Sequence, residues 1–559
     1  VGGDDDAILR AFRWDAGTIT RVPERDVALD LDTSVRALAF GPNGCVYALS
    51  EREDQLVTSC GAERRSVRTP PGPTQIQINN GIVIVTTAIG HALAAARLDA
   101  AGFPAVELVS IEHDGPFFGL ATAPRGAGVL VAAGGVEDAP LDRTGGFFGN
   151  VDSFVWLFAF DGAAWRRLST VNTSELGVVT PKALALEVRD GEAVTLATGY
   201  ASDAAVLIRT PLGSDLEGPS GAGEGGTRTE SVPSVPGLSK LARGVDGGLV
   251  GASTVLDAWV ALGPGEAPRV ERVQRGPRGQ LHLGEALFYT SLMGPWQEAT
   301  GPKSRFTCET CHLEGGVDGR THRTGRGDVV ATTKPLRGIF NNAPHFTRAL
   351  DKDTAEMVFA EFGVAAAASA NDGWFSLDEA PLAWARDVDL APDVDRSALG
   401  LRRALLGYLA HNAHAPNPRV GARRAFAPLE ARGAGLFEAR CAGCHAPRLV
   451  AGDATSSVPR SEWERLVMSE AGPIVWARDG YEKTGVEPYV HELGARPTSL
   501  RRLEDKRPYF TNGSAKTLGV VLERARWDGA RFFHDGAPEG AAGLSADERD
   551  SLAAFLLLL

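Results

Sequence analysis

The stretch IQINNGIVIVTTA, residues 76–88, places two apolar runs on either side of an Asn-Gly turn. Apolar runs of this length joined by a short glycine turn are typical of a β-hairpin. The pattern returns in four other stretches before residue 275. These are VRALAFGPNGCVYALS (35–50), LATAPRGAGVLVAAG (120–134), LALEVRDGEAVTLATG (184–199) and LARGVDGGLVGAST (241–254).

The recurrence of these hairpins predicts the fold of residues 1–275. The first three copies recur at about 40 to 45 residues and the later ones near 60, where loops take up the excess; a period of about 40 to 50 is typical of β-propeller blades. Dividing about 275 residues by about 40 gives an all-β propeller of six or seven blades. We expect the strand AILRAFRW (7–14) to complete the last blade beside DAWVALG (257–263). The alternative is an open β-sandwich of meandering hairpins.

The pattern changes after residue 275. Apolar residues now recur at helical spacing, as in LHLGEALFYTSL (281–292), ALGLRRALLGYLAHNA (398–413) and SADERDSLAAFLLLL (545–559). We therefore expect the C-terminal half to be mainly α-helical, with long loops. The whole chain is thus predicted to be multidomain.

Composition limits the classes of function. The chain has 559 residues and a net charge of −13. This acidic balance argues against nucleic-acid binding, because phosphate contacts need clustered Lys and Arg, but it suits a basic partner such as a small electron carrier. No apolar run reaches the roughly 18 to 20 residues of a membrane span. Val1 leads directly into GGDDDAILRAF with no signal peptide, which fits a mature or trimmed chain as well as a cytosolic one.

Four of the six cysteines fall in two copies of one motif, CETCH (308–312) and CAGCH (441–445). On a helical turn, residues i, i+3 and i+4 lie together, so two thiols and an imidazole can reach one porphyrin. C-x-x-C-H is the attachment motif of c-type haem. The predicted thioether cysteines and iron ligands are Cys308, Cys311 and His312 for a first haem, and Cys441, Cys444 and His445 for a second.

Two other readings of these cysteines fit less well. A structural zinc site uses four ligands and does not require a histidine after each cysteine pair. A thioredoxin-like C-x-x-C belongs in a βαβ unit, which the sequence lacks.

The remaining cysteines, Cys45 and Cys60, lie 15 residues apart on two predicted strands joined by a turn. We expect a disulfide between them; the alternative is two buried free thiols. A disulfide persists only in an oxidising compartment. Haem c is attached outside the bacterial cytoplasm, so both features predict a periplasmic or secreted protein.

Several segments surround the two haem motifs in a fixed order. They are LGEALFYTSL before CETCH, KPLRGIFNNAPHF after it, then GAGLFEARCAGCH, RPTSLRRLEDKRPYFTNGSAKTLGVVL and LSADERDSLAAFLLLL. This order resembles that of the bacterial di-haem cytochrome c peroxidases and their MauG-like relatives. The resemblance covers about 280–559 and implies two cytochrome c-like haem domains, residues 276–425 and 426–559. It also allows a calcium ion between them.

The resemblance implies a hydrogen-peroxide-dependent oxidoreductase. The first haem would react with peroxide through a ferryl species, and the second would relay electrons. The electrons would come from a small cytochrome or cupredoxin, or from a residue of a protein partner docking near the propeller. The alternative is a di-haem electron-transfer cytochrome without peroxidase activity; haem-dependent oxygenation is a third function, with no specific sequence feature in its favour.

The sequence departs from that family around the first haem. Where the family often places a Trp between the haems, this chain has His345-Phe346-Thr347, which makes Phe346 the inter-haem candidate. The distal candidates are His322, His345 and Glu356. For Glu356 the favoured interpretation is a solvated helix residue, with Met357 in the core. His322 is equally well a residue of a basic surface loop.

A second departure concerns the far ligand of the second haem. The family usually places Met or Tyr where this chain has Ala525, which cannot bind iron. We therefore expect His534, in RFFHDGAP, to bind the iron opposite His445. The alternative is a loop histidine that is bonded to Asp535. His491 and Met468 are the other candidates. A bis-histidine haem has a lower potential than a His/Met haem, because a thioether favours ferrous iron.

Overall fold

The computed structural model describes most of the chain. The described residues are 8–15, 18–29, 35–105, 107–138, 151–213, 226–244, 248–263, 266–273, 278–290, 307–323, 329–346, 352–361 and 390–559. Thr347, next to the inter-haem candidate Phe346, lies outside them.

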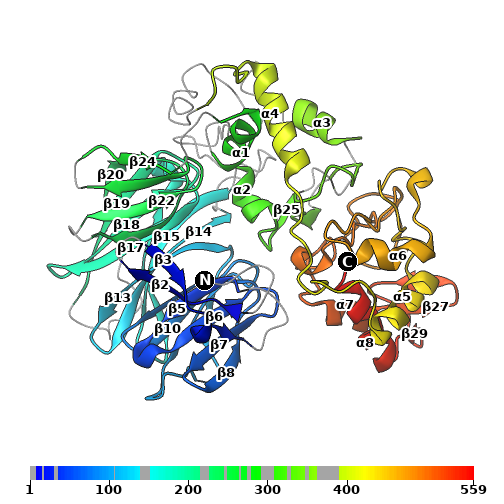
Figure 1. Cartoon of the computed structure of the whole chain (residues 1–559), viewed down its shortest axis with the longest axis horizontal. Helices are drawn as coiled ribbons and strands as arrows, with labels where there is room; N and C mark the ends of the chain where they lie inside the picture. Colours follow the sequence, from blue (N-terminus) through cyan, green and yellow to red (C-terminus); the bar gives the residue numbers. More distant parts are fainter. Residues whose placement is uncertain are drawn as a thin grey trace.

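Five four-stranded antiparallel sheets make up the N-terminal half (Figure 1). The first three contain β5 (Ala37–Phe40), β6 (Val46–Ser50), β7 (Gln55–Cys60) and β8 (Glu63–Arg68); β9 (Pro73–Asn79), β10 (Ile82–Thr87), β11 (Ala92–Arg97) and β12 (Val109–Glu112); and β13 (Phe117–Arg125), β14 (Gly128–Asp138), β15 (Val151–Phe160) and β16 (Trp165–Asn172). The other two contain β17 (Pro181–Arg189), β18 (Glu192–Gly199), β19 (Ala204–Pro211) and β20 (Arg228–Pro233); and β21 (Leu238–Arg243), β22 (Leu249–Ser253), β23 (Ala258–Leu262) and β24 (Arg269–Arg272).

Each predicted hairpin forms the first two strands of one of these sheets. In the stretch 76–88, β9 and β10 pair in antiparallel register, with Asn79 opposite Ile82. Asn80 and Gly81 between them have φ of 50° and 70°, the left-handed backbone that a tight two-residue hairpin turn requires. All six residues of β10 are buried, because both faces of this sheet are covered. The predicted repetition of antiparallel hairpins is confirmed, and the N-terminal half is propeller-like.

The predicted pairing of the first strand was wrong. β23 pairs with β22 and β24 and leaves no edge for residues 7–14. The N-terminal strands instead pair among themselves: β1 (Ile8–Leu9) with β4 (Val27–Ala28), and β2 (Phe12–Asp15) with β3 (Thr18–Arg21). Strand β3 follows β2 closely, so the β2 backbone hydrogen-bonds with this neighbouring strand rather than with a strand far along the chain.

The predicted disulfide is confirmed. Cys45 directly precedes β6, and Cys60 is the last residue of β7. These strands pair antiparallel, with Val46 opposite Ser59. This register brings the two cysteines opposite one another, and they form a disulfide with a Cα–Cα distance of 4.3 Å.

Reduction of this disulfide should destabilise the propeller-like half. The bond closes a loop between cysteines 15 residues apart, and a cross-link of that span contributes about 3 kcal/mol. Thioethers resist thiol reductants, so dithiothreitol should lower the unfolding temperature without releasing haem. The Cys45→Ala, Cys60→Ala double variant should show the same lower temperature and no further response to the reductant. An unfolding temperature that reduction leaves unchanged would contradict the expected contribution.

The C-terminal half combines short helices with long loops. The helices are α1 (Gln280–Tyr289), α2 (Cys308–Cys311), α3 (Thr354–Glu356), α4 (Ala398–His411), α5 (Pro428–Arg440), α6 (Arg460–Val467), α7 (Leu518–Arg524) and α8 (Ala546–Leu556). The short strands are β25 (Thr321–Arg323), β26 (Val330–Thr332), β27 (Arg526–Asp528), β28 (Arg531–Phe533) and β29 (Ala542–Gly543). The described part of the chain is mostly β, so two α-rich domains are not shown. Nor does any helix within it combine the length and apolarity needed to cross a bilayer.

Two similar helix pairs organise this half. Helix α1 packs on α4, where a Cβ added to Gly284 would lie 2.0 Å from the Ala404 carbonyl oxygen. Helix α5 packs on α8, where a Cβ added to Gly433 would lie 1.9 Å from the Ser551 carbonyl oxygen. Each glycine therefore permits close approach of two helix backbones. Helix α1 precedes CETCH in the sequence and α4 follows it, whereas α5 leads directly into CAGCH.

Ion pairs join the propeller-like sheets to both parts of the C-terminal half. They include Arg36–Glu314 at 2.7 Å, Arg52–Asp505 at 3.0 Å and Asp54–Arg507 at 2.5 Å. His91, at one blade loop, also hydrogen-bonds the Asp318 carbonyl oxygen at 2.8 Å. These contacts hold the sheets against the segments that carry the cysteine motifs.

Candidate functional site

The second motif closes a turn at the end of α5. The amides of Cys444 and His445 donate to the Cys441 carbonyl oxygen at 3.1 and 2.9 Å. Beside this turn lies a mostly apolar cavity of about 210 Å³. Its wall includes Cys441, Cys444, His445 and His534, together with apolar side chains from α5, α7 and α8. Two thiols and two imidazoles therefore line one apolar cavity.

His445 and His534 face each other in this cavity. Their ring centroids lie 6.4 Å apart, with the ring planes at 69°. Two imidazoles that bind opposite sides of one iron, each about 2.0 Å from it, would place their centroids roughly 6 Å apart. The histidine pair and the adjacent cysteines thus fit a c-type haem with two histidine ligands.

The surroundings of His445 and His534 keep both imidazole rings neutral. Burial, and then the nearby His445, lower the pKa of His534 to about 3. Burial likewise lowers the pKa of His445 to about 4, although the Thr498 and Trp476 carbonyls oppose this. Metal binding requires the neutral imidazole, which both histidines therefore present at neutral pH.

The alternatives for the far ligand lie elsewhere. Asp535 pairs with Arg524 at 3.0 Å, and no hydrogen bond joins it to the His534 ring in the described structure. His491 stacks on Tyr481 with ring centroids 4.1 Å apart, and Met468 is buried at the end of α6. Neither residue lines the cavity, whereas Ala525 does. The ligand role of His534 stays a prediction, but only His534 is placed opposite His445.

The first motif lies on α2, a single turn. Thr307 and Thr310 cap one another across its first residues, and the His312 amide donates to the Cys308 carbonyl oxygen at 2.8 Å. Burial lowers the pKa of His312 to about 4 and raises the pKa of the Cys308 thiol to about 12. The imidazole and the thiol are thus neutral, as at the second motif.

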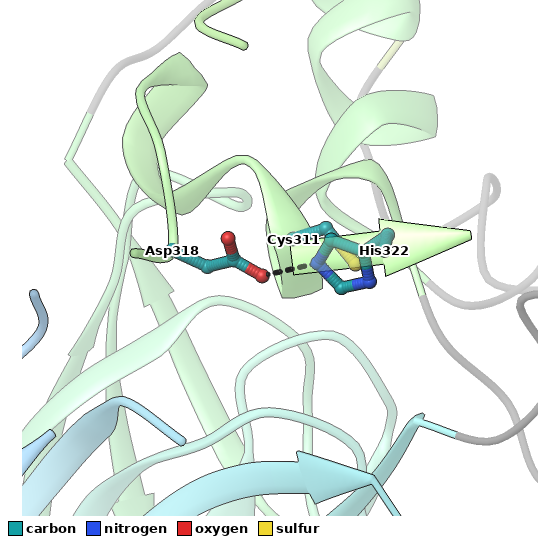
Figure 2. Close-up of side chains that lie close together, drawn as sticks. All are labelled: Cys311, Asp318 and His322. Atoms are coloured by element: carbon teal, nitrogen blue, oxygen red, sulfur yellow. Dashed lines mark hydrogen bonds and ion pairs between the residues drawn. The ribbon is translucent and has the colours of Figure 1, made fainter. Parts of the chain in front are cut away.

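His322 lies beside this motif but is already engaged. Its Nε2 is 2.8 Å from Oδ2 of the fully buried Asp318 (Figure 2). Cys311, Asp318 and His322 have ligand atoms within 4.8 Å of one another, a spacing that could also hold a metal ion. This placement sets His322 near the cysteine that would bind the porphyrin edge. Its role as a distal ligand stays a prediction.

The other first-site candidates lie further along the chain. His345 is buried and hydrogen-bonds the Thr354 hydroxyl at 2.9 Å. Phe346 lines a second cavity between the two C-terminal parts. The Glu356 carboxylate accepts a hydrogen bond from the Lys352 amide at 2.7 Å, and Met357 is buried. Glu356 is half-buried at the end of α3, and its catalytic role stays a prediction.

Sequence reasoning missed a contact between the first motif and the propeller-like half. Glu309, inside CETCH, is fully buried and forms an ion pair with Lys182 of β17. The Thr310 and Thr180 hydroxyls lie 3.3 Å apart. Burial, and then Glu314, raise the pKa of Glu309 to about 7 against the influence of Lys182. No spacing rule links residue 182 to residue 309, so only the three-dimensional fold reveals the pair.

Removal of Lys182 should destabilise the protein in a pH-dependent way. Lys182→Met leaves Glu309 as a buried carboxylate without its cation, which costs about 3 kcal/mol when the carboxylate is ionised. The folded-state pKa of Glu309 is raised, so the group favours folding below its unfolded pKa, and that contribution is lost as pH rises through about 7. The loss should therefore be larger at pH 8 than at pH 5. Thermal unfolding measures it.

A double variant provides the control for this prediction. Lys182→Met combined with Glu309→Gln removes both charges and should recover most of the lost stability at pH 8. Lys240→Met, an exposed lysine of β21, makes the same charge change without the partner. Equal losses at both pH values in Lys182→Met would show that Glu309 is not the cause.

Comparisons with known proteins give low-identity matches to solved structures alone. No family model and no curated protein matches the chain. The solved structures it matches are β-propeller-like proteins. They include virginiamycin B lyase from Staphylococcus aureus (11% identity, TM-score 0.27, 44% of this chain and 72% of that one) and apo AztD from Citrobacter koseri (10% identity, TM-score 0.31, 49% and 69%). A protein of unknown function from Desulfotomaculum acetoxidans matches at 11% identity and TM-score 0.33, over 50% and 81% of the two chains.

These comparisons correct the family resemblance. The neighbours are propeller-like, and they include no cytochrome c peroxidase or MauG-like protein. The resemblance rested on short segments flanking the cysteine motifs, whereas most of the regular structure is β. The predicted membership of that peroxidase family is therefore wrong. The calcium ion that it suggested stays untested.

Proposed function

We propose that this chain is a di-haem c-type oxidoreductase that transfers electrons in an oxidising compartment outside the cytoplasm. The single observation that supports it best is the His445–His534 pair, 6.4 Å apart in an apolar cavity that Cys441 and Cys444 also line. The disulfide Cys45–Cys60 agrees with such a compartment. Bound haem supplies an iron that alternates between the ferrous and ferric states.

Each part of the chain has a distinct role in this proposal. Residues 276–425 and 426–559 each form a cytochrome c-like unit that holds one haem. Residues 1–275 form a propeller of six or seven blades: the five sheets described above and at least one blade that includes β1–β4. His445 and His534 would hold the iron of the second haem, and their fixed placement in the cavity would limit rearrangement between the two oxidation states. Such a site exchanges electrons readily with a small cytochrome or cupredoxin.

A specific observation favours a second candidate function at the first motif. All eleven histidines lie in described residues, and none makes a ring contact with His312. His322 is paired with Asp318, and His345 with Thr354. Among the described histidines, His312 would then be the one placed to hold a haem at the first motif. Such a donor set would suit hydrogen-peroxide-dependent oxidation of a small electron carrier, or of a residue on a protein partner.

Magnetic circular dichroism in the near infrared tests the electron-transfer proposal. The ferric protein should give the band of a bis-histidine low-spin haem and no Met–iron band at the second site. The reduced protein should pass electrons to an oxidised small cytochrome or cupredoxin. A Met–iron band at the second site, or reduced haem that transfers no electrons to either class of carrier, would contradict the proposal.

Mixing with hydrogen peroxide tests the second candidate. Peroxide-dependent turnover of a reduced cytochrome would support it, and loss of that turnover in Cys308→Ala, Cys311→Ala would assign it to the first motif. An unreactive low-spin spectrum at both sites would leave electron transfer as the function.

A further inference from the structure

A second cavity, of about 120 Å³, lies between residues 334–346 and 496–511. Four cationic side chains line it: Lys334, Arg337, Arg496 and Lys506. Among the described residues of its wall there is no Asp or Glu. The chain as a whole has a net charge of −13, so a shortage of acids does not explain this composition.

The two lysines bond only to neutral oxygens. Nζ of Lys334 donates to the Thr332 hydroxyl at 2.9 Å, and Nζ of Lys506 donates to the Ser499 carbonyl oxygen at 2.8 Å. Arg496 donates to the Pro344 carbonyl oxygen. Within the described structure, only Arg337 has a carboxylate partner, Glu314 at 4.0 Å. Asp505 and Asp479 act on Lys506 and Arg496 through space but do not line the cavity, so four cations converge on a wall that has no acid of its own among the described residues.

This arrangement is costly without an anion. Lys334 and Lys506 are both half-buried in the cavity wall, and burial followed by Arg501 lowers the pKa of Lys506 to about 7. Cations withdrawn from water need a negative partner or lose their charge. A carboxylate or other oxyanion in the cavity would supply that partner.

The cavity adjoins the one beside the second motif. Lys334, Arg496, Thr498 and Tyr509 line both cavities. The cavity beside the second motif is mostly apolar and suits a porphyrin ring. The cationic cavity suits the carboxylates at the edge of that ring. The junction of the two is therefore where a haem attached to Cys441 and Cys444 would meet positive charge.

We propose that this cationic cavity binds the propionate carboxylates of the haem at the second motif, with Lys334, Arg496 and Lys506 as their partners. The inference rests on the proposed function, because it needs a haem at that motif. It deepens that function, since a cation beside a propionate opposes the extra positive charge of ferric iron and so raises the reduction potential.

Lysine variants of the haem-loaded protein test the proposal. Lys334→Met and Lys506→Met should each shift the propionate bending band in the resonance Raman spectrum. Each should also lower the midpoint potential of the bis-histidine haem. Lys506→Arg should restore both readings towards those of the natural chain, which separates loss of charge from misfolding. Lys240→Met, with the same charge change on the exposed side of β21, should change neither.

Three outcomes would overturn the inference. A Raman band and potential in both lysine variants that match those of Lys240→Met would show that these cations do not touch the propionates. A potential that depends on added inorganic phosphate in the natural chain but not in Lys506→Met, with an unchanged propionate band, would assign the cavity to a free anion. A shift that Lys506→Arg fails to reverse would assign the effect to altered packing. Absence of haem from Cys441 and Cys444, seen by mass before any variant is compared, would instead contradict the proposed function.

Discussion

Replacing both Cys441 and Cys444 by alanine should reduce the covalently bound haem from two per chain to one. Among the described residues that line the apolar cavity beside the second motif, these two thiols are the attachment points, and haem c is retained through its thioethers. The bis-histidine signal should vanish, because His445 and His534 then have no covalently held iron between them. Helices α5, α7 and α8 should become less stable, since their side chains line the cavity that the haem would fill.

The matched variant is Cys308→Ala with Cys311→Ala. It should also halve the haem content but preserve the bis-histidine signal, because it leaves the apolar cavity with His445 and His534 intact. Haem content by pyridine haemochrome absorbance and the ferric electron paramagnetic resonance spectrum measure both variants. If the bis-histidine signal were lost in Cys308→Ala, Cys311→Ala and kept in Cys441→Ala, Cys444→Ala, the two histidine ligands would belong to the first motif, which contradicts the prediction.

Substitution of His534 should have the second-largest effect. His534→Ala removes one of the two facing imidazoles and should convert the second haem from low spin to high spin. His534→Met should keep the haem low spin but raise its potential by on the order of 0.2 V, because a thioether favours ferrous iron. A Met–iron band should then appear in the near-infrared spectrum.

Two variants outside the cavity control for changes in packing that do not involve the iron ligand. His491→Ala removes a ring that stacks on Tyr481, and Met468→Leu changes a buried residue outside the cavity. Both should leave the spin state and potential of the second haem unchanged. A spin-state change in either variant, with His534→Ala silent, would exclude His534 as the ligand.

The sequence was most informative where the determinants are local. The hairpin at 76–88 follows from apolar runs around Asn80-Gly81, whose backbone adopts the turn that such residues favour. The Cys45–Cys60 disulfide followed from the same local pairing. Both C-x-x-C-H motifs could be located from spacing alone, and the structure places each on a closed turn.

The sequence was less informative about contacts between distant segments. The first strand pairs locally with β4 rather than with β23, which no hydrophobic pattern distinguishes. The Lys182–Glu309 ion pair and the cationic cavity join segments more than a hundred residues apart. The segments flanking the haem motifs suggested a family that the comparisons do not support. A short motif is set by the chemistry of its own site, and the same motif can occur on unrelated folds, so it says little about the rest of the chain.

The most direct measurement is the intact mass of the denatured protein, followed by mapping of its proteolytic peptides. The account predicts the added mass of two haems, one on the peptide with Cys308 and Cys311 and one on the peptide with Cys441 and Cys444. A chain with no haem or only one, or with zinc in place of iron, would contradict it.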